Sequence, residues 1–144
     1  MESQKINNIE VCSGQSRISI SSGNIADIFD RIGHLNIDII SKNHTDGGDT
    51  LVLSCDEGVA DMVIQAIGGD FACTKIDNLV KISITGIGIK NNTKVFYGVL
   101  AALNEINIQI FTLETSEVKI SVLINERDGD LAVQKIKNLD SSSF

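Results

Sequence analysis

Aromatic residues and positive charges are both scarce in this 144-residue chain. Aromatic side chains make up 4% of the sequence and tryptophan is absent, which argues against a stacking platform for unpaired bases. Only 12 lysines and arginines stand against 19 acidic residues, so the net charge is −7. Non-specific nucleic-acid binding requires a positive field along the phosphates. We therefore expect no nucleic-acid partner.

Long hydrophobic runs are also missing. Apolar stretches are short and interrupted by charges, so no segment is expected to span a bilayer. The first five residues lack the apolar core of a signal peptide. With 42% hydrophobic and 22% charged residues the composition is that of a globular protein. We expect a cytoplasmic protein without a membrane partner.

No set of residues suited to catalysis can be assembled from the sequence. Cys12, Cys55 and Cys73 are far apart and form no Cys-x-x-Cys pair, so we expect buried thiols rather than a redox or metal site. His34 and His44 each lack a neighbour suited to catalysis or ligation. No Ser/His/Asp or Cys/His arrangement stands out. The chain is therefore expected to hold no catalytic residue, no metal and no cofactor.

Two glycine-rich loops are candidates for ligand binding. Residues 86–90, Gly-Ile-Gly-Ile-Lys, are neither a Walker loop nor a complete dinucleotide fingerprint, and we interpret them as a strand-to-helix turn. A helix that begins nearby could still hold a carboxylate on its free N–H groups, with Asn92 and Thr93 as further donors. His44–Asp49 lacks the alternating acidic ligands of a calcium loop and is expected to connect a hairpin.

What the chain does contain is an alternation between strand and helix periodicity. Polar and apolar residues alternate in Arg17–Ser21 and Asn36–Ser41, which predicts half-buried strands. Apolar residues at spacings of three and four predict amphipathic helices. The first half thus predicts the order strand, helix, strand, strand, helix, strand. The predicted strands cover 17–21, 36–41, 51–55 and 71–76, and the predicted helices cover 25–35 and 59–67.

The second half repeats this pattern at a nearly constant offset. The apolar stripe of the first helix recurs 71 residues later, as does the Asn-Ile start of the next strand. A repeat of this length indicates tandem domains rather than a solenoid. We place a first domain with an N-terminal extension at 1–76 and a second at 77–144. The matching pairs are Ile25–Phe96, Ile28–Val99, Phe29–Leu100, Ile32–Leu103, Leu35–Ile106, Asn36–Asn107 and Ile37–Ile108.

Units of about 70 residues are marginally stable alone, because small domains bury too little of their unfolded surface. Open sheet edges also invite pairing. We therefore expect the two units to pack side by side or across a dimer, with a groove at the junction.

The turn at residues 114–117, Glu-Thr-Ser-Glu, has a structural and a functional interpretation. As structure, its hydroxyls satisfy backbone groups of a hairpin turn, and the spacing alone favours this interpretation. As function, Ser116 and Glu117 would bind a ligand's ammonium group, while the helix N-terminus near Thr93 holds the ligand's carboxylate.

Residues 115–124, Thr-Ser-Glu-Val-Lys-Ile-Ser-Val-Leu-Ile, closely resemble the second ACT domain of aspartate kinases. Residues 80–90 are similar to the strand and loop that precede this motif in the family, and residues 28–40 are similar to the first ACT domain. The resemblance extends from about Ile9 to Leu139. It implies an α+β fold of two ferredoxin-like βαββαβ ACT domains packed side by side.

The resemblance implies a regulatory, non-catalytic role. Lysine, threonine or both would control aspartate phosphorylation in lysine, threonine and methionine biosynthesis. The signature of the kinase domain appears nowhere in the sequence, so the implied partner is a kinase domain or a separate catalytic subunit, with a homodimer formed through ACT domains. The alternatives are a structural dimerisation module with vestigial effector sites and a stand-alone amino-acid sensor.

Effector sites in the family lie where one ACT unit meets another. Matched by position, the implied site residues come from the loops before the helices, the strand starts and the turn. They are Gly23, Asn36, Ile37, Asp38, Asn92, Thr93, Asn107, Ile108, Ser116 and Glu117. The loop before the first helix is shorter here than in the family and keeps only Gly23 of its motif, which implies weak or lost binding at the first site.

Overall fold

The computed structural model describes residues 8–22, 24–85, 93–116 and 119–139. The chain forms two compact units. Residues 14–79 make up one of them, here called the middle unit. Residues 1–13 and 80–144 make up the other, here called the terminal unit. Two strands, β1 and β4, contribute residues to both units.

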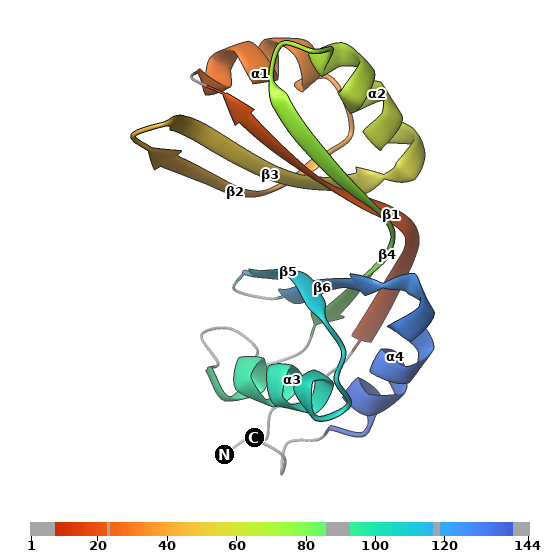
Figure 1. Cartoon of the computed structure of the whole chain (residues 1–144). Coiled ribbons are helices and arrows are strands. Elements are labelled where there is room, and N and C mark those ends of the chain that lie inside the picture. The colour runs from red at the N-terminus through yellow and green to blue at the C-terminus, as the bar shows by residue number, and fades with distance from the viewer. Residues whose placement is uncertain (1–7, 23, 86–92, 117–118, 140–144) are drawn as a thin grey trace. The chain divides into compact units, whose positions relative to one another are not determined.

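The middle unit has the order strand, helix, strand, strand, helix, strand. Its strands are arranged β2-β3-β1-β4, and both helices lie on one face of this sheet (Figure 1). The order of elements is the one that the periodicity predicted, and the arrangement is the ferredoxin-like βαββαβ fold that the family resemblance implied. Its elements are β1 (Asn8–Ser22), α1 (Ile25–Ile32), β2 (Asp38–Thr45), β3 (Gly48–Asp56), α2 (Glu57–Ile67) and β4 (Ala72–Thr85).

Local chemistry sets the ends of these elements. Asn24 caps α1, because its side-chain oxygen accepts a hydrogen bond from the backbone N–H of Ala26 at 2.9 Å. A two-residue turn, Asp46-Gly47, joins β2 to β3 and confirms the predicted hairpin. Gly48 follows with a φ of 115°, a conformation that glycine adopts without a steric penalty.

The core of the middle unit lies between its sheet and its two helices. Ile18 and Ile20 of β1 stand opposite Leu53 and Leu51 of β3, and all four side chains are buried. The buried residues of α1 and α2 close the core from the helix side, as the helical periodicity predicted. These helix residues are Ile28, Ile32, Ala60, Val63 and Ile67.

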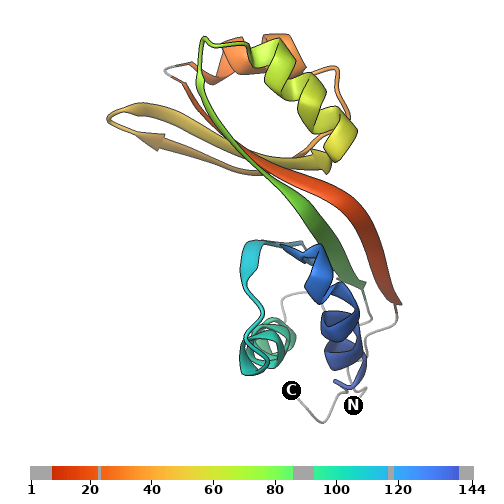
Figure 2. The ribbon, with the colours of Figure 1, turned by 45° about the vertical axis from the view of Figure 1, so that its right-hand side comes forward.

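The terminal unit repeats the arrangement, with the strand order β1-β4-β6-β5. Both of its helices again lie on one face of the sheet (Figure 2). Its core is separate from that of the middle unit and includes Val80, Ile82 and Ile84 of β4. The further elements are α3 (Thr93–Glu105), β5 (Ile110–Thr115), β6 (Lys119–Asn125), a 3₁₀ turn (Glu126–Asp128) and α4 (Gly129–Lys137).

The division of the chain differs from the predicted boundary between residues 76 and 77. Residues 8–13 of β1 belong to the terminal unit, where Ile9 packs against the core. A βαββαβ unit needs a further strand beside its first strand. The first strand of the terminal unit is β4, and residues 8–13 supply the strand beside it. The middle unit is thus inserted into the sequence of the terminal unit. How the two units pack together remains a prediction.

Two strands are longer than the periodicity predicted. The strand predicted at 17–21 is part of β1, which begins at Asn8, and β4 runs without a break from 72 to 85. Each strand passes from one unit to the other close to a residue with positive φ, Gly14 at 65° in β1 and Asn78 at 60° in β4. These residues interrupt the polar–apolar alternation while the strand continues.

The expectation of three buried thiols was correct only for Cys55. Cys55 is buried and Cys73 is half-buried, but Cys12 is exposed. Cys12 lies on the part of β1 that precedes the strand predicted at 17–21. Across the described ranges, no helix is long and apolar enough to cross a membrane.

Candidate functional site

The predicted site residues of the middle unit lie at the start of β2. Asn36 and Ile37 follow α1, and Asp38 opens β2 opposite Ser54. Asn36 and Asp38 are exposed, whereas Ile37 is half-buried against the core. Two polar side chains are therefore accessible to a ligand here, and the isoleucine between them anchors the segment.

The equivalent residues of the terminal unit precede β5. Asn107 has a φ of 58° and is exposed, and its backbone N–H donates to the carbonyl of Asn104 at 3.0 Å. Asparagine tolerates this left-handed conformation better than most residues. Ile108 is only 7% exposed and packs in the core, with its N–H donating to the carbonyl of Leu103. Asn107 can contact a ligand through its side chain, while Ile108 offers only backbone.

Ser116 follows directly after β5, and Glu114 and Thr115 of the predicted turn belong to that strand. The backbone N–H of Ser116 donates to the carbonyl of Lys119 at 2.8 Å, and the Ser116 side chain is exposed. Thr93 is the first residue of α3. Gly23, Asn92 and Glu117 lie outside the described residues, as does the glycine-rich loop at 86–90.

Asn107 and Ser116 lie at opposite ends of β5. This strand has six residues and, at about 3.3 Å per residue, spans about 20 Å. A free amino acid is much shorter than this distance. Within one terminal unit the structure therefore does not bring the strand-start residues and the turn to the same ligand.

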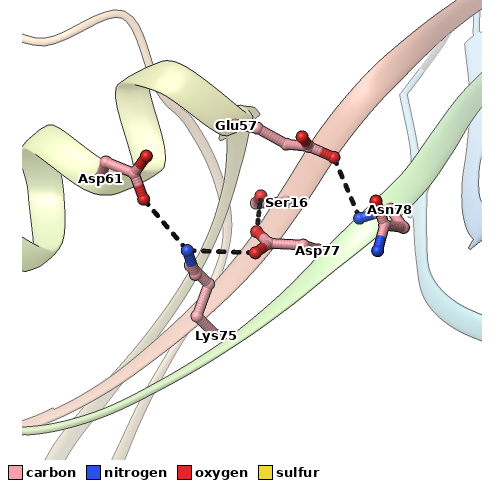
Figure 3. Close-up of polar contacts among 6 residues, drawn as sticks. All are labelled: Ser16, Glu57, Asp61, Lys75, Asp77 and Asn78. Carbon is pink, nitrogen blue, oxygen red and sulfur yellow. Dashed lines mark hydrogen bonds and ion pairs between the residues drawn. The ribbon is translucent and has the colours of Figure 1, made fainter.

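A polar cluster that was not predicted from the sequence joins β1, β4 and α2 in the middle unit (Figure 3). The ammonium group of Lys75 lies 3.1 Å from carboxylate oxygens of both Asp61 and Asp77. The hydroxyl of Ser16 donates to Asp77, and Ser16 itself is fully buried. A carboxylate oxygen of Glu57 accepts from the backbone N–H of Asn78 at 3.1 Å. This last bond supports the positive φ of Asn78.

Charges within this cluster shift two pKa values in opposite directions. The hydrogen bond from Ser16, followed by the interactions with Lys75, lowers the pKa of Asp77. The hydrogen bonds to Asp61 and then to Asp77 raise the pKa of Lys75. The cluster therefore favours the ionised form of both groups at neutral pH.

Replacing Asp77 by Asn is expected to lower the melting temperature at pH 7 by about 2–4 °C, a small effect because the carboxylate is partly exposed. A carboxyl group with a lowered pKa stabilises the fold above its unfolded pKa of about 3.9 and loses this effect as the pH falls through the lower folded value. The difference between wild type and Asp77→Asn should therefore disappear in acid. Thermal unfolding followed by circular dichroism from pH 7 to pH 3 measures it.

The matched control for this prediction is Asp30→Asn, which removes an exposed carboxylate from α1 of the same unit. We expect it to change the melting temperature much less. An Asp77→Asn protein as stable as wild type at pH 7 would show that the cluster does not stabilise the middle unit.

Within the described residues, no group of three or more His, Cys, Asp or Glu side chains is arranged to hold a metal ion. The acidic members of the polar cluster face Lys75 and backbone or hydroxyl donors instead. Their arrangement is suited to holding β1, β4 and α2 together.

Comparison with known proteins agrees with this geometry. Residues 82–139 match the family model of the ACT domain. The aspartokinase of Helicobacter pylori is 29% identical over 148 residues, which cover 94% of this chain and 36% of that protein. The aspartokinase of Corynebacterium glutamicum is 31% identical over 130 residues, covering 83% and 31%. The ligand-free regulatory subunit of aspartate kinase from Thermus thermophilus superposes with a TM-score of 0.79 at 17% identity, covering 91% of this chain and 95% of that one.

Fold and comparisons first define the class: the chain has the fold of two ACT domains, and residues 82–139 match the family model of that domain. More particularly, it corresponds to the regulatory ACT region of aspartate kinases, and the resemblance carried by the Thr-Ser-Glu motif is confirmed. The chain spans about a third of the length of the curated aspartokinases that it matches. The superposition at 17% identity shows the fold alone.

Proposed function

We propose that this chain binds a feedback amino acid, lysine or threonine, and thereby controls the phosphorylation of aspartate by a kinase domain or catalytic subunit. The observation that supports this most strongly is the extent of the match. Nearly the whole chain aligns with about a third of an aspartokinase. It also superposes on 95% of a chain described as a regulatory subunit of aspartate kinase.

The proposed effector sites lie where ACT units of two copies of the chain meet. Asn36, Asp38, Asn107 and Ser116 have exposed side chains that can bind the polar groups of an amino acid. A second copy also resolves the separation along β5, because residues from opposite ends of two different strands can approach one ligand. The remaining proposed contacts are Gly23, Ile37, Asn92, Thr93, Ile108 and Glu117.

The proposed mechanism is a shift between two arrangements of the ACT units. An effector that binds one arrangement more tightly increases its population and so favours one activity state of the kinase. The effector can shift this equilibrium only by its difference in affinity for the two arrangements.

Titration calorimetry of the purified chain with lysine and with threonine tests the proposal. We expect saturable binding of at least one of them, and at least a tenfold loss of affinity in Asn107→Gly, which removes the side chain but keeps the positive φ available. The matched control is Asn104→Ala, which changes a nearby exposed side chain of α3. Absence of binding heat with both amino acids would contradict the proposal.

A structural dimerisation module is the second candidate function. It is favoured by the burial of Ile108 and by the separation of Asn107 from Ser116, since the predicted contacts do not converge within one unit. A thermal-shift screen of free amino acids separates the two candidates. A dimer whose melting temperature no amino acid changes would support the structural role, and a shift by an amino acid other than lysine or threonine would support a sensor with another partner.

A further inference from the structure

Arg31, in the last turn of α1, links the two helices of the middle unit. Its Nη1 atom donates to the backbone carbonyls of Ala66 at 3.4 Å and Ile67 at 2.8 Å, which lie at the end of α2. Its Nη2 atom lies 2.9 Å from a carboxylate oxygen of Asp70. The guanidinium carbon lies 5.0 Å from the centre of the Phe71 ring. One planar guanidinium group thus contacts helix carbonyls, a carboxylate and an aromatic ring together.

The terminal unit has an alanine at the equivalent position. Ala102 of α3 follows Arg31 at the repeat offset of 71 residues. Helices α3 and α4 lie next to each other as α1 and α2 do (Figure 1), and a hollow of about 280 Å³ lies between them. Ala102 lines this hollow from α3, and Lys135, Asn138 and Leu139 line it from the end of α4. The hollow therefore corresponds to the place that the Arg31 side chain fills in the middle unit.

The three kinds of group that Arg31 contacts are also found around the hollow. Glu105 lines it and supplies a carboxylate whose side chain is 71% exposed. Tyr97 lines it as well and supplies an aromatic ring that is 69% exposed. The end of α4 supplies backbone carbonyls, because the last turn of a helix leaves its C=O groups without intrahelical partners. The negative end of the helix dipole also favours a cation at this place.

We propose that the hollow between α3 and α4 binds a guanidinium group, carried either by free arginine or by an arginine side chain of a partner. The bound group takes the place that Arg31 takes in the middle unit. It donates to the carboxylate of Glu105 and to carbonyls at the end of α4, and it stacks on the ring of Tyr97. A lysine ammonium group is a point charge and does not match this planar set of partners.

Lys135 competes with the ligand for Glu105. Its ammonium group lies 3.3 Å from a carboxylate oxygen of Glu105. An exposed pair of this kind contributes little stability, whereas a guanidinium can form two parallel hydrogen bonds with the same carboxylate. The ligand therefore displaces Lys135 from Glu105. Removing Lys135 should strengthen the binding of a cation and weaken the binding of an anion, so this residue reports the charge of the true ligand.

Titration calorimetry of the full chain with L-arginine tests the proposal. The matched control ligand is L-citrulline, which has nearly the same shape as arginine and no side-chain charge. We expect arginine to bind more tightly by a factor of about ten or more, because only the guanidinium forms charge-assisted hydrogen bonds. N-acetyl-arginine amide distinguishes the two sources. Equal binding of this compound identifies an arginine residue of a protein as sufficient, and binding of free arginine alone identifies the free amino acid.

Three variants examine the site itself. Glu105→Gln should weaken arginine binding by a factor of about five or more, since it removes the carboxylate. Lys135→Met should tighten it by a factor of about two or more, since it removes the competing charge. Ala102→Arg should abolish it, because the new side chain places its own guanidinium in the hollow as Arg31 does. Asn104→Arg is the matched control, since it adds the same charge at an exposed position of α3 that does not line the hollow.

Circular dichroism verifies the fold of each variant. A wild-type chain that does not distinguish arginine from citrulline would overturn the proposal. Weaker binding in Lys135→Met, or undiminished binding in a folded Ala102→Arg protein, would also overturn it. The site is independent of the proposed effector site, because Asn107 and Ser116 do not line the hollow. Absence of lysine and threonine binding would therefore contradict only the effector proposal.

Discussion

A chain that lacks residues 1–13 is expected to keep the middle unit folded and to lose the native structure of the terminal unit. Residues 8–13 supply a strand beside β4, and Ile9 packs against the core of the terminal unit. Without them one edge of β4 loses its hydrogen-bond partners and part of the core becomes exposed. Hydrogen exchange followed by mass spectrometry should show lost protection in α3, β6 and α4, with protection retained in α1, α2 and β3.

Two point variants refine this truncation. Ile9→Asp should reproduce much of the loss, because it places a carboxylate against an apolar core. Val11→Asp is the matched control, since Val11 is 53% exposed on the same strand. If the truncated chain loses protection in the middle unit instead, residues 8–13 belong with residues 14–79, as the boundary expected from the sequence implied.

Ile32→Ala and Leu103→Ala are each expected to destabilise one unit by about 2–5 kcal/mol. These residues occupy equivalent positions of α1 and α3, and both are fully buried, each in a different core. The lost contacts and the remaining cavity account for the size of the effect. Ile32→Ala should accelerate hydrogen exchange mainly in α1 and α2, and Leu103→Ala mainly in α3 and α4.

The controls for the core variants are exposed apolar residues of the second helix in each unit. Met62 on α2 is 51% exposed and Leu131 on α4 is 50% exposed. Their replacement by alanine should change the free energy of unfolding by at most about 0.5 kcal/mol. Equal acceleration of exchange in both units by either core variant would show that the chain has one cooperative core instead of two.

The helices and the repeat were predictable because they depend on local periodicity. Apolar residues such as Ile28 and Val99 recur at helical spacing, and the structure buries both of them. The Asp46-Gly47 turn likewise follows from local chemistry. Each of these features needs only residues that are close together in the sequence.

The interleaving of the two units was not predictable in the same way. The alternation in residues 8–13 covers only Asn8 to Val11, too short to show that this segment pairs with β4, more than 60 residues later in the sequence. The polar cluster likewise joins Ser16 to Asp77, which are 61 residues apart. Contacts of this range depend on tertiary pairing and leave no periodic pattern in the sequence.

The candidate site was predictable in its parts and not in its geometry. The offset of the repeat predicted Asn36 and Asn107 at the starts of strands, and in the structure both precede the strand, which begins at Asp38 in β2 and at Ile110 in β5. The resemblance to the ACT family did not indicate how far apart Asn107 and Ser116 lie. Their separation by the length of β5 became evident only in the structure. Whether these residues meet across two copies remains a prediction.

Aspartyl phosphate formation by the aspartate kinase that we propose contains or binds this chain is the most direct test of the regulatory role. The rate should be measured at increasing concentrations of lysine and of threonine. We predict inhibition by at least one of them, and a shift of that inhibition to higher concentration in Asn107→Gly. A rate that saturating lysine and threonine, added singly or together, leave unchanged would contradict the regulatory proposal.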